Sequence, residues 1–139
     1  LLNASNVVVA TKSGTIRFNT TSGMYEGTID LGTGITQGVY QIKVKSDQYL
    51  RSRVPGIHTL TKETINVLPE AVLIAGDINN DNRLNILDYN ILEGCYSDLL
   101  PAKDCTTTNQ ALADLNDDSK ADQVDYNLFL KEISNRVGE

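Results

Sequence analysis

Hydrophobic and polar positions alternate along the first half of the chain. The clearest alternation runs from Tyr40 to Lys45, where every second residue is apolar, and this is typical of a half-buried strand. Turns that contain glycine or proline separate it from other segments rich in β-branched and aromatic residues. The predicted strands are residues 7–11, 15–20, 25–31, 39–46, 49–53, 57–61, 64–68 and 71–75. Short strands at these intervals predict a small antiparallel β-sandwich over residues 1–75.

From Gly76 onward the pattern changes to an internal repeat with a fixed offset of 37 residues. The repeated polar positions are Asp77, Asn79, Asp81 and Asp88 in the first copy and Asp114, Asn116, Asp118 and Asp125 in the second. Apolar residues recur at helical spacing behind each copy, and they predict one helix per copy. The sequence therefore predicts an α+β chain of two modules, a β-sandwich over residues 1–75 and a helical module over residues 76–139.

Each copy has the ligand spacing of an EF-hand calcium loop. Such a loop places carboxylate or amide oxygens at positions 1, 3 and 5, a main-chain carbonyl at position 7, and further oxygens at positions 9 and 12. The candidate ligands are Asp77, Asn79, Asp81, Arg83 (by its carbonyl), Asn85 and Asp88 in the first loop, and Asp114, Asn116, Asp118, Lys120 (by its carbonyl), Asp122 and Asp125 in the second. Zinc is disfavoured, because neither loop contains histidine or cysteine. The duplication predicts two calcium ions as the cofactors.

Position 6 of each loop departs from the usual pattern. A calcium loop normally has glycine there, because the chain turns sharply. This sequence has Asn82 and Ser119 instead, and serine tolerates the left-handed conformation less well than asparagine. The second loop, however, carries four ligand-position carboxylates against three in the first. These two features oppose each other, and the sequence alone does not rank the two sites.

Charge is distributed unevenly between the two halves. The net charge is −6; residues 1–73 contribute about +2 and residues 74–139 about −8. This acidic balance argues against nucleic acid or an anionic membrane as the main partner, and no apolar run is long enough for a membrane-spanning helix. A single histidine, His58, and two cysteines leave little for catalysis, so we expect no enzyme. The chain starts at Leu1 without a signal peptide, and we expect it to be a piece of a longer protein.

Cys95 and Cys105 lie between the two copies and outside both calcium loops. In a small extracellular chain they are typical of a disulfide that closes the loop between the copies. Two free or buried thiols are the alternative at this point.

The second module resembles the dockerin family over residues 76–137. The resemblance is carried by the opening Gly-Asp-x-Asn-x-Asp at residues 76–81, by the two loop–helix copies, and by the aspartates that end both loops. It implies a module that binds two calcium ions and docks onto a cohesin-like domain of a partner protein. It also implies a secreted or cell-surface protein, in some cases one of polysaccharide degradation, and contact with carbohydrate through the parent protein stays open.

The same resemblance implies which residues meet the partner. These are Ile86, Leu87, Glu93 and Gly94 in the first copy, and Gln123, Val124, Leu130 and Lys131 in the second. An exposed apolar patch at Ile86 and Leu87 would suit docking. In the alternative, Leu87 and Val124 belong to the core.

The first module resembles, more loosely, transthyretin-like or carboxypeptidase-regulatory-like sandwiches, and immunoglobulin-like sandwiches share its pattern. The pattern is Gly38-x-Tyr40-x-Ile42-x-Val44, then Tyr49, a turn, and Thr64-x-Asn66-Val67. The leading interpretation is a calcium-binding interaction module with an adjoining β-sandwich. The alternative is a calcium-rigidified segment of a surface protein or adhesin, in which the helical module packs on its own β module without a separate cohesin.

Overall fold

The computed structural model describes residues 1–98, 100, 102, 105–133 and 136–139. The chain forms two compact units, and each is described by itself. Unit 1 comprises Leu1–Ile42 and Pro55–Pro69, and unit 2 comprises Lys43–Val54 and Glu70–Glu139. Unit 2 therefore takes in a segment, Lys43–Val54, that the sequence assigned to the first module. The proposed module boundary at residue 75 stays a prediction.

Unit 1 is built from short antiparallel strand pairs. The strands β1 (Arg17–Asn19) and β2 (Met24–Glu26) form one pair, and β3 (Gly38–Tyr40) and β7 (His58–Leu60) form another. All sheets among the described residues are two-stranded, so the predicted sandwich is not confirmed and stays a prediction.

Two of the predicted strands do not form, and a third, residues 71–75, contributes only its last residue to a strand. Residues 7–11 contribute only an isolated bridge between Val8 and Leu2. Residues 64–68 form no strand, because the side-chain amide of Asn66 bonds both the N–H and the carbonyl of Thr61. These bonds satisfy in a turn the groups that a ladder would otherwise use.

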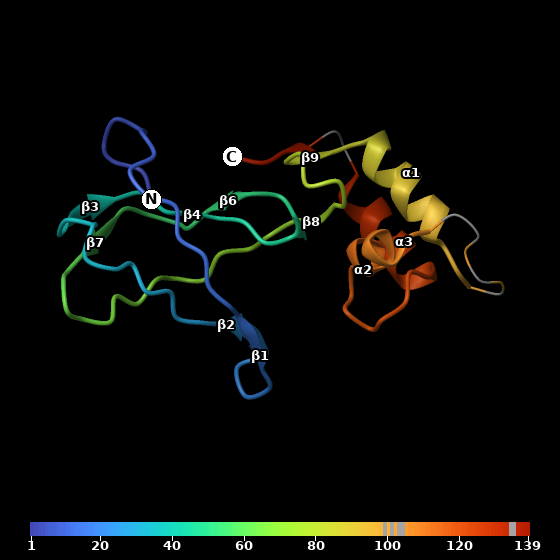
Figure 1. The fold of residues 1–139 in the computed structure, drawn as a ribbon, viewed down its shortest axis with the longest axis horizontal. Helices are drawn as coiled ribbons and strands as arrows, with labels where there is room; N and C mark the ends of the chain where they lie inside the picture. Colours follow the sequence, from blue (N-terminus) through green and yellow to red (C-terminus); the bar gives the residue numbers. More distant parts are fainter. Residues whose placement is uncertain (99, 101, 103–104, 134–135) are drawn as a thin grey trace. The chain divides into compact units, whose positions relative to one another are not determined.

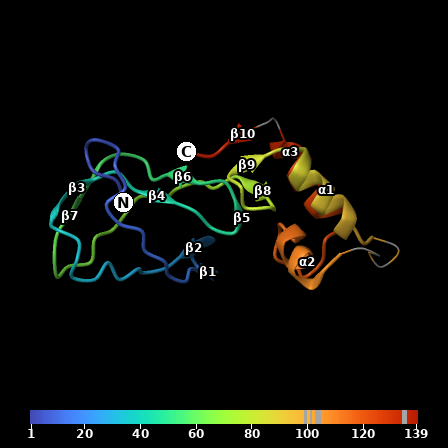
Figure 2. The same cartoon turned by 45° about the horizontal axis from the view of Figure 1, so that its top comes forward.

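Unit 2 combines three strand pairs with three helices. The strands β4 (Lys43–Val44) and β6 (Ser52–Arg53) form a hairpin, and β5 (Gln48–Tyr49) pairs with β8 (Ala75–Asp77). Near the calcium loops, β9 (Arg83–Leu84) pairs with the C-terminal β10 (Arg136–Val137). Figure 2 shows β5, β8 and β9 close together beside the helices.

The helices are α1 (Ile86–Cys95), α2 (Thr107–Ala113) and α3 (Gln123–Glu132), drawn in yellow, orange and red in Figure 1. Helices α1 and α3 are the two predicted from the sequence, and both begin with a capping box. The short α2 was not predicted. It spans two turns between Thr106, its N-cap, and the second loop, which is too short for a clear hydrophobic period.

The core of unit 2 lies between the helices and the strands. Its buried members are Leu50, Ile78, Leu84, Leu92, Cys95, Ala113, Leu115, Ala121 and Phe129. Aromatic contacts join α1 to α3, with the ring centroids of Tyr89 and Tyr126 6.2 Å apart and those of Tyr89 and Phe129 6.1 Å apart. Leu50 comes from the hairpin segment and is only 2% exposed. The hairpin is therefore part of this core.

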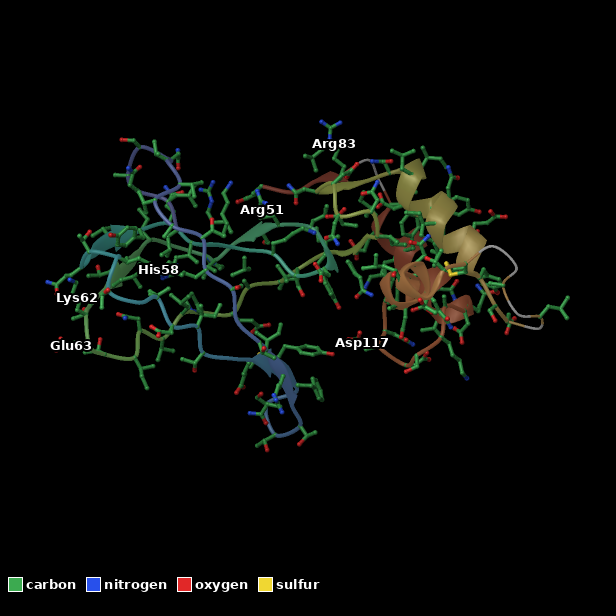
Figure 3. The ribbon with its side chains drawn as sticks, viewed as in Figure 1. Arg51, His58, Lys62, Glu63, Arg83 and Asp117 are labelled. Atoms are coloured by element: carbon green, nitrogen blue, oxygen red, sulfur yellow. A yellow bond between two sulfur atoms is a disulfide. The ribbon has the colours of Figure 1, made fainter. Side chains whose placement is uncertain are left out.

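Cys95 and Cys105 form a disulfide, as the sequence predicted. Their Cα atoms are 4.7 Å apart, and no free cysteine remains in the chain. The bridge ties the end of α1 to the segment that leads into α2 (Figure 3). No helix in the described part of the chain has the length and apolar character that crossing a bilayer requires.

Candidate calcium loops

The two loops have the same unusual backbone. Asn80 and Asn82 have φ values of 59° and 65°, and Asp117 and Ser119, 37 positions later, have values of 61° and 74°. Positions 4 and 6 of both loops thus adopt the left-handed conformation. The tight turn expected at position 6 is therefore present in each loop, without glycine.

The residue before the first loop is constrained by close packing. Gly76 has a φ of 115°, and a Cβ atom there would lie 2.8 Å from Leu84 Cδ1 and 3.1 Å from Phe129 Cδ2. Only glycine satisfies both the conformation and the space. Glycine lets β8 pack closely against Leu84 and Phe129, and the strand ends at Asp77, the first position of the loop.

The carboxylates at position 12 close both loops in the same way. Asp88 accepts hydrogen bonds from the N–H of Asn79 at 3.1 Å and of Asn85 at 2.9 Å. Asp125 accepts the equivalent bonds from Asn116 at 3.1 Å and from Asp122 at 2.8 Å. Each carboxylate therefore fastens the loop to the first turn of the helix that follows.

The earlier ligand positions repeat as closely. The carboxylate at position 1 accepts the N–H of position 6, the amide oxygen at position 3 accepts the N–H of position 5, and the carboxylate at position 5 accepts the N–H of position 7. In the first loop these acceptors are Asp77, Asn79 and Asp81, and in the second they are Asp114, Asn116 and Asp118. The structure brings the predicted side chains into two matching loops.

Several of these carboxylates are buried. Asp77, Asp88 and Asp125 are fully buried, and Asp114 is 8% exposed. Burial raises the pKa of Asp88 and of Asp125, while hydrogen bonds from backbone N–H groups act in the opposite direction. Neighbouring carboxylates raise both pKa values further. A buried carboxylate is costly unless a positive charge or hydrogen bonds compensate it, so a cation in the loop would stabilise these groups further.

The donor set suits a hard cation. The side chains that line the loops offer carboxylate and amide oxygens, the ligands that calcium prefers. Figure 3 shows the Arg83 side chain pointing away from the protein, and the role of its main-chain carbonyl at position 7 stays a prediction. Among the described residues, no three or more carboxylate, imidazole or thiol groups already form one metal-binding cluster.

Position 9 has a role in the helices that the sequence did not reveal. Asn85 and Asp122 are the N-caps of α1 and α3, and their side-chain oxygens accept the N–H of Leu87 and of Val124, each at 2.8 Å. Their place among the calcium ligands stays a prediction.

The residues assigned to partner contact are largely exposed. Ile86 is 59% exposed, Leu87 55%, Val124 48% and Leu130 45%. Glu93, Gln123 and Lys131 are exposed as well. The interpretation that Leu87 and Val124 belong to the core is therefore wrong, while their role in docking stays a prediction.

Three residues of the hairpin segment make contacts at the loops that sequence reasoning missed. The ammonium of Lys45 lies 2.6 Å from Asp77 Oδ2. The Gln48 side-chain amide donates to the carbonyls of Ala111 and Asp114, and the N–H of Arg51 donates to the Asn82 side chain. These partners are 31 to 66 residues apart in sequence, so no local pattern indicates them.

The fold and the loops together define a duplicated calcium-loop module, in which each loop leads into a helix. Residues 75–134 match the family model of the dockerin type I domain. The match spans less than half of the chain and supports a dockerin domain in that segment: a calcium-binding module for protein–protein interaction that typically binds cohesin domains. Neither the comparison with curated proteins nor that with solved structures gave a match.

Proposed function

We propose that the chain binds two calcium ions, one in each loop, and that the filled loops hold α1 and α3 as a docking surface for a cohesin-type domain. The repetition of one hydrogen-bond pattern in both loops carries this proposal. The side chains at positions 1, 3, 5 and 12, four of the six predicted ligand positions, make equivalent hydrogen bonds in both loops. A second copy that had lost calcium binding would not be expected to keep the same hydrogen bonds at the same positions.

The docking surface consists of exposed apolar residues on the two helices that follow the loops. Each helix presents such residues in its first turn, Leu87 on α1 and Val124 on α3. Both are also tied to their loop through the caps Asn85 and Asp122. Calcium that orders the loops would therefore also fix the helix starts, which couples ion binding to docking.

The test measures binding of a purified cohesin domain to the full chain in calcium and in chelator. We expect binding only with calcium, and we expect Leu87→Asp combined with Val124→Asp to abolish it, because charges would be buried in an apolar interface. The matched control is Val67→Asp, which changes an apolar residue of unit 1 that is 88% exposed. Binding that survives the double substitution would contradict the assigned surface.

We place the protein outside the cell or at its surface, with the dockerin segment anchoring an adjoining β-sandwich module. The disulfide between Cys95 and Cys105 supports this location, because such bridges persist in oxidising compartments. We assign the chain no catalytic step.

A structural role is the second candidate, and the hairpin favours it. Lys43–Val54 belongs to unit 2 and supplies Leu50 to its core, so the helical module already packs against a β element of its own chain. In this alternative, calcium stiffens a surface protein and no cohesin is bound. Calcium-dependent stabilisation without binding to any of a panel of cohesin domains would support it.

A further inference from the structure

The Lys45 side chain is held firmly beside the first loop. Its ammonium donates to Asp77 Oδ2 at 2.6 Å and to Asn80 Oδ1 at 2.7 Å. It also donates to the carbonyls of Tyr49 at 2.6 Å and Ser46 at 3.3 Å. Four oxygens thus surround one ammonium, and its charge lies against a carboxylate that is fully buried.

The backbone keeps this lysine in place. It lies between β4 and β5, and β5 pairs with β8, the strand that ends at Asp77. The next residues of the segment are fixed by Gln48, which donates to the Asp114 carbonyl, and by the buried Leu50. The ammonium therefore has little freedom to move away from Asp77.

Asp114, the residue of the second loop that corresponds to Asp77, forms no ion pair with a lysine or arginine among the described residues. The Asp114 carboxylate accepts backbone N–H groups, from Asp118 at 3.0 Å and from Ser119 at 2.6 Å. The contact that the hairpin makes there is neutral, from the Gln48 amide to a main-chain carbonyl. Asp117 replaces Asn80 at position 4, and Asp122 replaces Asn85 at position 9, so the second loop is the more negative of the two.

We propose that Lys45 acts as a built-in counter-cation that weakens calcium binding in the first loop, so that calcium fills the second loop first. The inference goes beyond the proposed two-ion site and depends on it. An ammonium at hydrogen-bond distance partly neutralises the carboxylate of Asp77, the predicted first ligand of its loop. It also repels a divalent cation over a short distance, while greater ligand charge tightens calcium binding in the other loop.

The same contact makes the first loop less dependent on calcium for its order. Without the ion, Lys45 still neutralises one buried carboxylate, so the loop keeps part of its electrostatic balance. Within the described part of the chain, the Asp114 carboxylate of the second loop has only backbone N–H groups as partners. The two loops would then respond to calcium over separate concentration ranges rather than together.

The test follows the amide signals of Arg83 and Lys120, one reporter in each loop, by NMR as calcium is added to chelator-stripped full-length protein. We expect Lys120 to respond at the lower concentration. In Lys45→Met, the midpoint of Arg83 should fall by about tenfold or more, since a cation is removed from contact with the ligand shell. The midpoint of Lys120 should stay within about twofold, because the two loops do not share this contact.

Three further variants separate charge from structure. Lys43→Met is the matched control, because it removes the same charge from the same hairpin and should leave the Arg83 midpoint in place. Lys45→Arg keeps the cation and should also leave it unchanged. Lys45→Gln keeps a hydrogen-bond donor without charge, and it should reproduce the shift if Lys45→Met fails to fold in chelator.

The results that overturn the inference are distinct from those that overturn the proposed function. If both loops bind calcium but Arg83 responds first, or if neutral Lys45 variants leave its midpoint unchanged, only the role of Lys45 is wrong. If neither reporter responds at millimolar calcium, the two-ion proposal fails and this inference fails with it.

Discussion

Asp88 and Asp125 lie 37 residues apart and make the same pair of backbone hydrogen bonds, each linking a loop to the first turn of the next helix. The same carboxylates are fully buried. A duplicated loop therefore carries buried negative charge at two equivalent places. Calcium would neutralise this charge, which links the stability of unit 2 to the ion.

Leu50 should be as important to unit 2 as residues inside the dockerin segment, although it lies outside residues 75–134. It is 2% exposed and belongs to the core between the helices. Leu50→Ala should lower the free energy of unfolding by about 2–4 kcal/mol. Chemical denaturation measures this, with Ile65→Ala as the control, since Ile65 is 85% exposed. Equal effects of the two substitutions would show that the hairpin is not part of the core.

The left-handed backbone conformation of Ser119 is strained for serine, and glycine would adopt it without strain. This serine has a φ of 74° and is exposed, so Ser119→Gly should stabilise the calcium-bound protein by about 0.5–1 kcal/mol. Asn82→Gly makes the same change at the equivalent position, where the side chain also accepts the N–H of Arg51. That substitution should gain less or lose stability. The comparison uses thermal unfolding in saturating calcium, and a loss of stability in Ser119→Gly would count against this view of the loop.

The response to pH should differ between the calcium-free and calcium-bound protein. Burial raises the pKa of Asp88 and of Asp125 above the ordinary value of 3.8. In chelator, the folded chain then binds more protons than the unfolded chain, so these two groups add stability as the pH falls through their raised pKa values towards 3.8. Calcium requires the ionised carboxylates, so acid favours its release.

The melting temperature with calcium minus that with chelator should therefore shrink as the pH falls from neutrality towards the ordinary carboxyl pKa of 3.8. Paired thermal scans across this range measure the difference. A difference that stays constant or grows on acidification would show that protons do not compete with calcium at these groups.

The disulfide should stabilise unit 2 without taking part in calcium binding. Cys95 and Cys105 lie outside both loops and close a short segment between the copies. Replacing both by alanine should lower the free energy of unfolding by about 2–3 kcal/mol and leave the number of bound ions unchanged. Denaturant unfolding combined with calcium titration tests both parts, and loss of an ion in the alanine variant would contradict the assignment.

The loops could be predicted from sequence because their information is local. Spacing within a dozen residues places Asp77, Asn79, Asp81 and their counterparts around one turn, and the repeat confirms the register. The helices α1 and α3 could be predicted because apolar residues recur at helical spacing behind each loop. The disulfide could be predicted in the same way, from two cysteines ten residues apart.

Long-range features could not be predicted in this way. Lys45 and Gln48 are polar residues of an alternating segment, and nothing near them indicates that they meet loops 32 and 66 residues away. Helix α2 could not be predicted because its seven residues are too few to show a clear helical repeat of apolar positions. In unit 1, strand propensity indicated residues 64–68, but the side-chain bonds of Asn66 favour a turn there.

The most direct test of the account is a calorimetric titration of calcium into chelator-stripped full-length protein, for the wild type and for Asp77→Ala and Asp114→Ala. Each aspartate occupies the first position of its loop, where a ligand is predicted, and accepts the backbone N–H of position 6. We predict two ions per chain in the wild type and one in each variant. Absence of binding at millimolar calcium, or two ions in either variant, would contradict the assignment of the loops.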